Sequence, residues 1–187
     1  MKTKAFRWAA PTIAVLVLAA VTGAWGETPK YIALSGTIND YTPQANPPAL
    51  QPVVAGPWEV RGHWTLVVNR NSGKADFSAE LTMERSDQGV IANGNDFNNP
   101  AIRKAHTHHI HMSGTATFIS GVLQVQGPAM ITVSGAFPPP FGPNVPLTVQ
   151  ITGGNAVPFS NIAVAFGSPA DTHFGTAPLH GVVRRVE

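Results

Sequence analysis

Apolar and polar residues alternate along most of this chain, which is the pattern of β-strands with one face buried. In the clearest run, residues 58–69, one set of alternate positions is apolar apart from a glycine, and the other set is mostly polar. A turn rich in Asn, Ser and Gly follows at 70–74, and the alternation resumes over 75–85. The two runs therefore predict a β-hairpin.

Six further segments show the same alternation and bring the predicted total to about eight strands. They are residues 31–38, 106–118, 122–133, 147–151, 162–166 and 179–186. The Gly127-Pro128 pair interrupts the fifth strand and predicts a bulge or a strand switch there. Because no segment has the apolar spacing of a long helix, the chain is predicted to form a single antiparallel all-β domain.

The lengths of the predicted connections favour one topology. The first, third, fifth and seventh connections are long, whereas the second, fourth and sixth are short turns. In an up-and-down β-barrel the odd connections lie at one end and the even ones at the other, so all the long loops would gather at a single rim. The up-and-down barrel is therefore the preferred prediction. A β-sandwich is the alternative, because loops as long as the first and third can cross between two sheets.

The inward positions carry large side chains, which bear on whether such a barrel has room for a ligand. A barrel of about eight strands encloses barely enough space for its own side chains. The large residues with inward parity are Trp64, Phe77, Leu81, Phe118 and Phe166. Either the barrel is wide enough to leave a lumen, or these side chains fill it and binding is confined to the rim.

The first 26 residues predict a secretory signal peptide. Three basic residues among the first seven precede an uncharged, mostly apolar run at 12–24, and Ala24 and Gly26 supply the small residues that a signal peptidase reads. The apolar run is shorter than the ~20 residues of an ordinary membrane helix. We therefore expect segment 1–26 to be removed and residues 27–187 to form an exported domain with no membrane span.

The amino-acid composition limits the cellular compartment and the kinds of functional site that are expected. The chain has no cysteine, which excludes disulfides, thiolate metal sites and cysteine nucleophiles. An exported domain of this size without disulfides is more typical of bacteria, in the periplasm or outside the cell. Three of the 12 Lys and Arg residues lie in the predicted signal, so the mature chain has nine bases against ten acids and a net charge of −1. Nucleic-acid binding is excluded, because it would need a basic patch.

Four of the seven histidines lie close together on the fourth predicted strand. Alternation divides them into two pairs: His106 and His108 share the inward parity of Ile110, whereas His109 and His111 point outward. Imidazole is the commonest metal ligand, and each pair has a spacing that lets two rings on one face of a strand reach one ion. The outer pair is predicted to belong to a solvated strand face.

The barrel topology brings further residues to the rim at which the fourth strand begins. His173 lies in the seventh connection and His180 at the start of the eighth strand, so both are predicted to face His106 and His108 across the barrel mouth. Trp58 starts the second strand at the same rim and is predicted to form an apolar wall. The other residues of interest in these loops are Tyr41, Asp96 and Asp171.

These residues predict an exported protein that binds a small molecule or a metal ion at a histidine-lined rim. The predicted ligand contacts are His106, His108 and Trp58, and the predicted metal ligands are His106, His108, His173 and His180. Three or four imidazoles suit zinc or copper, and Met112 can add a soft ligand for copper. Without a metal, the inward histidines would cap the core or contact an organic ligand.

Two other functions stay open at this level. A histidine-bound zinc or copper ion at the same rim can act as a Lewis acid or redox centre, which would make the protein a metalloenzyme. A structural or adhesive envelope module would need no pocket at all. A serine hydrolase is not supported, because the chain contains no Gly-x-Ser-x-Gly pattern.

We expect the exported protein to begin at Glu27, because Ala24 and Gly26 place the cleavage after Gly26. Intact-mass analysis or N-terminal sequencing of the protein recovered outside the cytoplasm checks this. A start at Trp25 would move the cleavage to Ala24, and an uncleaved chain beginning at Met1 would contradict the signal peptide.

Overall fold

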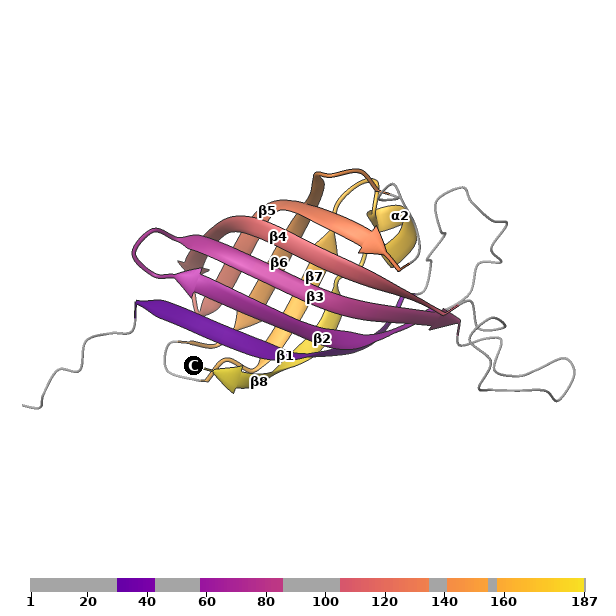
Figure 1. The fold of residues 1–187 in the computed structure, drawn as a ribbon. Coiled ribbons are helices and arrows are strands. Elements are labelled where there is room, and N and C mark those ends of the chain that lie inside the picture. The colour runs from indigo at the N-terminus through magenta and orange to yellow at the C-terminus, as the bar shows by residue number, and fades with distance from the viewer. Residues whose placement is uncertain (1–29, 43–57, 86–104, 135–140, 155–157, 187) are drawn as a thin grey trace, which may run out of the picture.

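The computed structural model describes residues 30–42, 58–85, 105–134, 141–154 and 158–186, which form a closed antiparallel barrel of eight strands (Figure 1). The strands are β1 (Tyr31–Thr42), β2 (Trp58–Asn69), β3 (Lys74–Arg85), β4 (His106–Ile119), β5 (Val122–Val133), β6 (Val145–Thr152), β7 (Asn161–Phe166) and β8 (Leu179–Val186). Each strand pairs with its neighbours in sequence, and β8 returns to pair with β1. The predicted up-and-down barrel is confirmed, and the sandwich alternative is wrong because one sheet closes on itself.

The alternation located the strands to within a few residues. The predicted ranges of β2, β5 and β8 agree with the structure, whereas β1 continues past its predicted end at Ile38 as far as Thr42, where it still pairs with Trp58. One short helix, α2 (Asp171–Phe174), lies between β7 and β8 and was not predicted, since four residues are too few to show a helical period. No helix within the described ranges is long and apolar enough to cross a membrane.

The Gly127-Pro128 pair does not produce the predicted bulge or strand switch. The β4–β5 register is the same on both sides of it, with Met112 opposite Ala129 and Thr115 opposite Gln126. Between the Met112–Ala129 pair and the Thr115–Gln126 pair the β4–β5 ladder is interrupted, and Pro128 has no N–H to donate to it. The register shift of this barrel lies instead at its closure, between Ser35 and Gly36 on the β1–β8 side.

The inward positions of the strands form one continuous apolar core. Four of the five large residues with predicted inward parity are at most 7% exposed, namely Trp64, Phe77, Leu81 and Phe166. Phe118 is the exception: it is 48% exposed near the short-turn end of β4, where its ring lies 6.4 Å from that of Phe159. Since full burial of such a side chain stabilises the fold by roughly 1.5–3 kcal/mol, filling the interior is the main source of stability.

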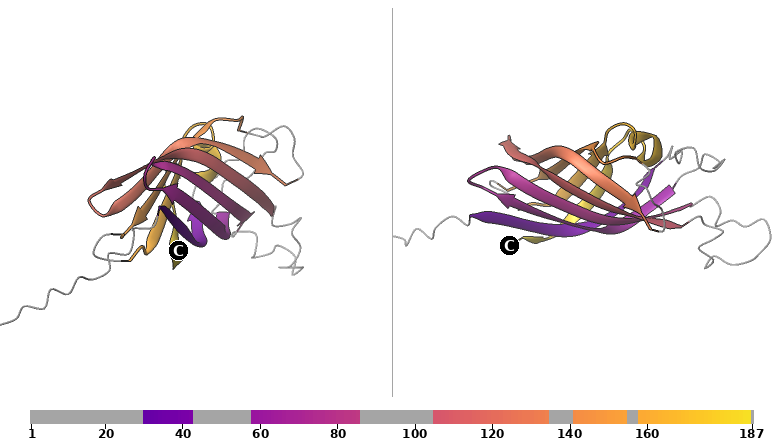
Figure 2. Two further views of the ribbon diagram at one scale, coloured as in Figure 1. Left: turned by 60° about the vertical axis from the view of Figure 1, so that its left-hand side comes forward. Right: turned by 45° about the horizontal axis from the view of Figure 1, so that its top comes forward.

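The two ends of the barrel differ in their connections. The β2–β3, β4–β5 and β6–β7 turns lie at one end, where Gly73 and Gly121 adopt positive φ angles of 68° and 79°. The strand ends that the long connections join lie at the other end, together with α2, and we call this end the long-loop rim. In Figure 1 and in the right-hand view of Figure 2, α2 lies at the end of the barrel at which β5 ends. The rim predicted to hold the histidines is therefore the one that α2 covers.

The closure between β1 and β8 leaves no space at Gly36, which gives a test of the barrel. A Cβ atom at this position would lie 1.9 Å from the Val182 carbonyl oxygen and 2.8 Å from Cζ2 of Trp64. We expect Gly36→Ala to lower the free energy of unfolding by roughly 3 kcal/mol in urea denaturation, because backbone must move to accept the methyl group. The neighbouring Ser35→Ala is the control and should change it by less than about 1 kcal/mol. Equal stability of the two variants would contradict this closure.

Candidate metal centre

The alternation of side chains at the start of β4 determines which histidines point into the barrel. His106 and His108 have the parity of the buried Ile110 and point inward, as predicted, whereas His109 and His111 are exposed on the outer face. His108 is 1% exposed, and His106, nearer the open end, is half-buried. The inward pair thus lies at the long-loop rim, where a strand can admit polar side chains without placing them in the middle of the core.

The β7–β8 connection brings His173 to the same place. The Gly167 N–H donates to the Pro146 carbonyl (2.7 Å), and the following turn leads into α2, where the His173 N–H donates to the Ala170 carbonyl (2.9 Å). Phe174 anchors this segment by stacking on Phe166, with ring centroids 4.0 Å apart and planes inclined by 11°. His173 is consequently held over the barrel mouth and is 3% exposed.

The three imidazoles converge through their Nε2 atoms. The His173 Nε2 atom lies 2.9 Å from that of His108 and 3.3 Å from that of His106. Ring centroids are 4.8 Å apart for His106 and His108, 5.4 Å for His106 and His173, and 4.8 Å for His108 and His173. We call these three residues the histidine triad. Its residues present one ligand atom each within 4.8 Å of one another.

These separations suit a transition-metal ion. Two imidazole nitrogens on one tetrahedral zinc, each about 2.0–2.1 Å from the metal, lie about 3.3 Å apart. The His106–His173 separation already has this value, and the His108–His173 separation is slightly shorter. The ligand atoms of His106 and His108 lie within 4.8 Å of each other, and a similar separation of these two would complete a three-nitrogen site.

Aromatic side chains enclose the triad. The Trp58 ring meets the His106 ring edge to face at 5.4 Å, so the predicted contact of Trp58 with this rim is observed. Phe174 approaches His108 at 4.8 Å, and Phe141 approaches His173 at 5.4 Å. Phe141 and Phe174 were not foreseen, because neither shares a strand with the histidines. These rings exclude water from the buried side of the triad.

Burial keeps two of the three rings neutral. Desolvation, together with the charges that His173, His106 and His109 would carry, lowers the pKa of His108 from 6.5 to about 2. Desolvation, with a smaller effect of His106, lowers the pKa of His173 to about 3. The neutral imidazole is the form that binds a metal, so both rings are available as ligands at neutral pH.

Polar atoms without partners gather at this end of the barrel. Among the described residues, the buried side-chain atoms with no hydrogen-bond partner at this end are Thr42 Oγ1, Trp58 Nε1, His108 Nδ1, Asp171 Oδ1 and His173 Nδ1, and one further such atom, Trp64 Nε1, lies in the middle of β2. Each such atom costs about 1–3 kcal/mol of stability. Those at this end lie at the rim that the histidines occupy, which is a pattern expected of a binding site rather than of a packed core.

The structure does not bring every predicted ligand to the triad. His180, expected to face the other histidines, is 67% exposed on the outer surface, where its Nδ1 atom lies 3.1 Å from Asp40 Oδ2. The reason is that Leu179 occupies the inward position at the start of β8. Tyr41 is also exposed, and Asp96 lies outside the described residues.

The two buried methionines of β3 and β4 lie at different depths. Met112, the predicted soft ligand, is four positions beyond His108 along β4, which is about 13 Å in a strand. Met83 is also fully buried, and it lies directly opposite His106 in the β3–β4 ladder. Met83 is therefore the methionine nearer the triad, and the sequence alone could not show this because the register of β3 against β4 was unknown.

The outward histidines belong to a solvated surface. His63 lies opposite Glu80, as predicted, and Glu80 also lies opposite His109, whose Nδ1 atom is 3.6 Å from Glu80 Oε2. His111 Nδ1 lies 3.2 Å from the Ser78 hydroxyl. An exposed ion pair of this kind is worth at most about 1 kcal/mol, so these residues contribute little to stability.

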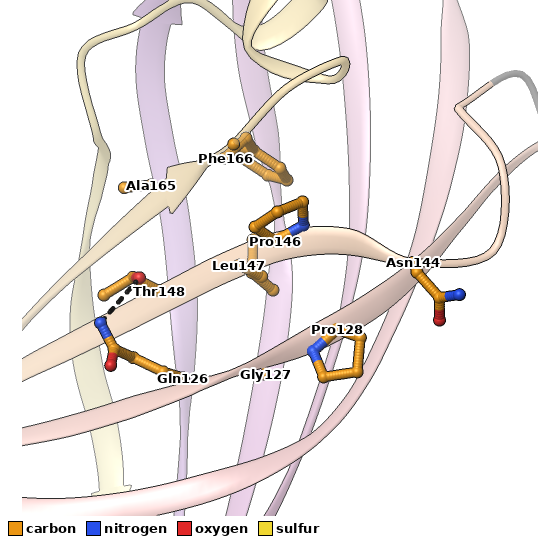
Figure 3. A pocket seen from close by; sticks show the side chains of 10 residues that line it. Gln126, Gly127, Pro128, Asn144, Pro146, Leu147, Thr148, Ala165 and Phe166 are labelled. Carbon is orange, nitrogen blue, oxygen red and sulfur yellow. Dashed lines mark hydrogen bonds between the residues drawn. The ribbon is translucent and has the colours of Figure 1, made fainter.

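A groove on the outside of the barrel is separate from the triad. It has a volume of about 470 Å³ and runs over β5, β6 and β7, where Gln126 Nε2 donates to Thr148 Oγ1 at 3.4 Å (Figure 3). Pro128 and Pro146 lie opposite each other in its floor. None of the described residues that line it is titratable.

Comparison of the chain with protein-family models, with curated proteins and with solved structures gave no match.

The lowered pKa values predict that acid destabilises the metal-free protein. Below the unfolded-state pKa of 6.5 the unfolded chain binds protons at His108 and His173 that the folded chain does not, so stability is retained above pH 6.5 and lost as the pH falls. Between about pH 6 and pH 4 each ring should contribute a loss of about 1.4 kcal/mol per pH unit. Urea denaturation in the presence of a chelator measures this slope. His108→Leu should reduce this slope by the contribution of one ring, which is about half of what His108 and His173 contribute together. An unchanged slope in that variant would contradict the assignment.

Proposed function

We propose that this chain is an exported protein that binds one zinc or copper ion through His106, His108 and His173. The observation that carries the proposal is the convergence of the three Nε2 atoms at one rim of the barrel. Neutrality of the two buried rings supports it, because a neutral imidazole has a nitrogen lone pair to offer a metal ion. Export is supported by the basic, apolar and small-residue order of segment 1–26.

A metal ion fits the described residues better than an organic ligand does. Trp64, Phe77 and Leu81 occupy the interior, so the barrel holds side chains where a small molecule would have to enter. At the rim, Trp58 and Phe174 already contact the histidine rings. The three histidine ligand atoms lie within 4.8 Å of one another, which is close enough for all of them to bind one ion.

A metalloenzyme is the second candidate, and one observation favours it. The triad supplies three nitrogens, and catalytic zinc sites commonly combine three protein ligands with a water molecule at the fourth position. His106 is the half-buried member, so that position would open on its side. A bound zinc would there lower the pKa of its water to about 7 and supply hydroxide as a nucleophile.

The test is metal binding by tag-free protein that has first been stripped with a chelator. We expect about one zinc or copper ion per chain by mass spectrometry, and a rise in the free energy of unfolding of about 2.7 kcal/mol at a hundredfold excess of free metal over Kd. His108→Leu should lose the ion, because it removes a triad nitrogen. His109→Leu, on the outer face of the same strand, is the matched control and should keep it.

The outcomes separate the candidates. Absence of stoichiometric metal in the wild-type protein, or equal metal content in the two variants, would refute the triad as a metal site and leave the structural module. Hydrolysis of an activated ester by the zinc-loaded protein, lost in His108→Leu and kept in His109→Leu, would favour the enzyme.

A further inference from the structure

The charge of the triad bears on which ion it takes. Its three ligands are neutral imidazoles, and the metal-capable group found among the described residues contains no carboxylate. The cost of transferring an ion from water to a buried site rises with the square of its charge, and His108 and His173 are almost completely buried. A divalent ion would leave a charge of +2 on this site, whereas a monovalent ion would leave +1.

Asp171 changes the net charge of the site but not the preference for a monovalent ion. This residue begins the helical turn that carries His173, and its Oδ1 atom is buried with no described partner. If its carboxylate is counted, the site is neutral with a monovalent ion and has a charge of +1 with a divalent one. On either count the monovalent ion leaves the smaller buried charge.

The enclosure favours a low coordination number. Phe141 and Phe174 lie against the buried rings, and Trp58 lies against His106. Zinc completes a tetrahedron with a fourth donor, and divalent copper prefers a tetragonal set of nitrogen and oxygen ligands. Univalent copper is satisfied by fewer donors, so it is the ion least penalised by aromatic walls that supply none.

The strand next to β4 carries a thioether, Met83, opposite His106. Met83 is fully buried and pairs with His106 across the β3–β4 ladder, and both side chains point into the barrel. Directly opposite residues have Cβ atoms about 4.5–5.5 Å apart, which is within the reach of a methionine side chain. Thioether sulfur is a soft ligand that selects univalent copper and is not a usual ligand of zinc.

We infer that the ion of the histidine triad is univalent copper, held by His106, His108 and His173 with the Met83 thioether as a further soft donor. The inference rests on the proposed function, since it assumes that the triad binds a metal. It concerns binding alone, so it requires no electron transfer within the protein.

The test compares univalent copper and zinc on the tag-free full chain. Affinity for univalent copper is measured anaerobically, with ascorbate, in competition with bicinchoninate, and affinity for zinc in competition with a chromophoric zinc chelator. We expect one copper ion per chain, bound more tightly than zinc and lost in His108→Leu. Met83→Leu should weaken copper binding about tenfold and zinc binding less than twofold. Met112→Leu, an equally buried methionine deeper in the barrel, is the matched control and should change neither.

Three results would overturn the inference. Tighter binding of zinc than of univalent copper, with zinc lost in His108→Leu, would refute it and leave the proposed function intact. Equal copper affinities of Met83→Leu and Met112→Leu would show that Met83 is not a ligand and would refute the assigned ligand set. Binding of neither ion would refute the proposed function as well. Circular dichroism of each variant shows whether it is folded.

Discussion

Closure of eight strands into one narrow barrel is the constraint on which the other features depend. A closed sheet has one inside, and side chains that alternate along each strand must fill it. Near the middle of the strands that space is occupied by Trp64, Phe77 and Leu81. Polar side chains can therefore enter the interior only near a rim, which is where His106 and His108 lie.

The triad depends on a contact between parts of the chain that are far apart in sequence. His173 reaches the β4 histidines because α2 folds back over the barrel mouth and Phe174 stacks on Phe166. The same packing that fixes the helical turn desolvates the rings and keeps them neutral. The folding of α2 over the barrel mouth thus links the geometry of the site to its burial.

Alternation along the sequence predicted the strands and the inward pair His106 and His108, because side-chain parity is a local and regular property of a strand. The up-and-down topology then predicted that His173 lies at the same rim. His180 was misplaced because Val182 and Val183 are adjacent, which hides the parity of β8. In the structure the alternation continues from the buried Leu179, so Val183 packs on the core, whereas Val182 points outward and is 44% exposed. Phe141, Phe174 and Met83 could not be predicted: Phe141 lies in a loop, Phe174 in a four-residue helical turn, and Met83 is placed opposite His106 by a strand register that no periodicity encodes.

The most direct test of the account is the position of the ion itself. In a crystal of the metal-loaded protein, anomalous scattering at the absorption edge of the metal locates the ion without assuming its ligands. The account predicts a single ion about 2.0–2.1 Å from the Nε2 atoms of His106, His108 and His173. An ion bound instead on the outer face between Glu80 and His109, with the triad atoms still in contact with one another, would contradict it.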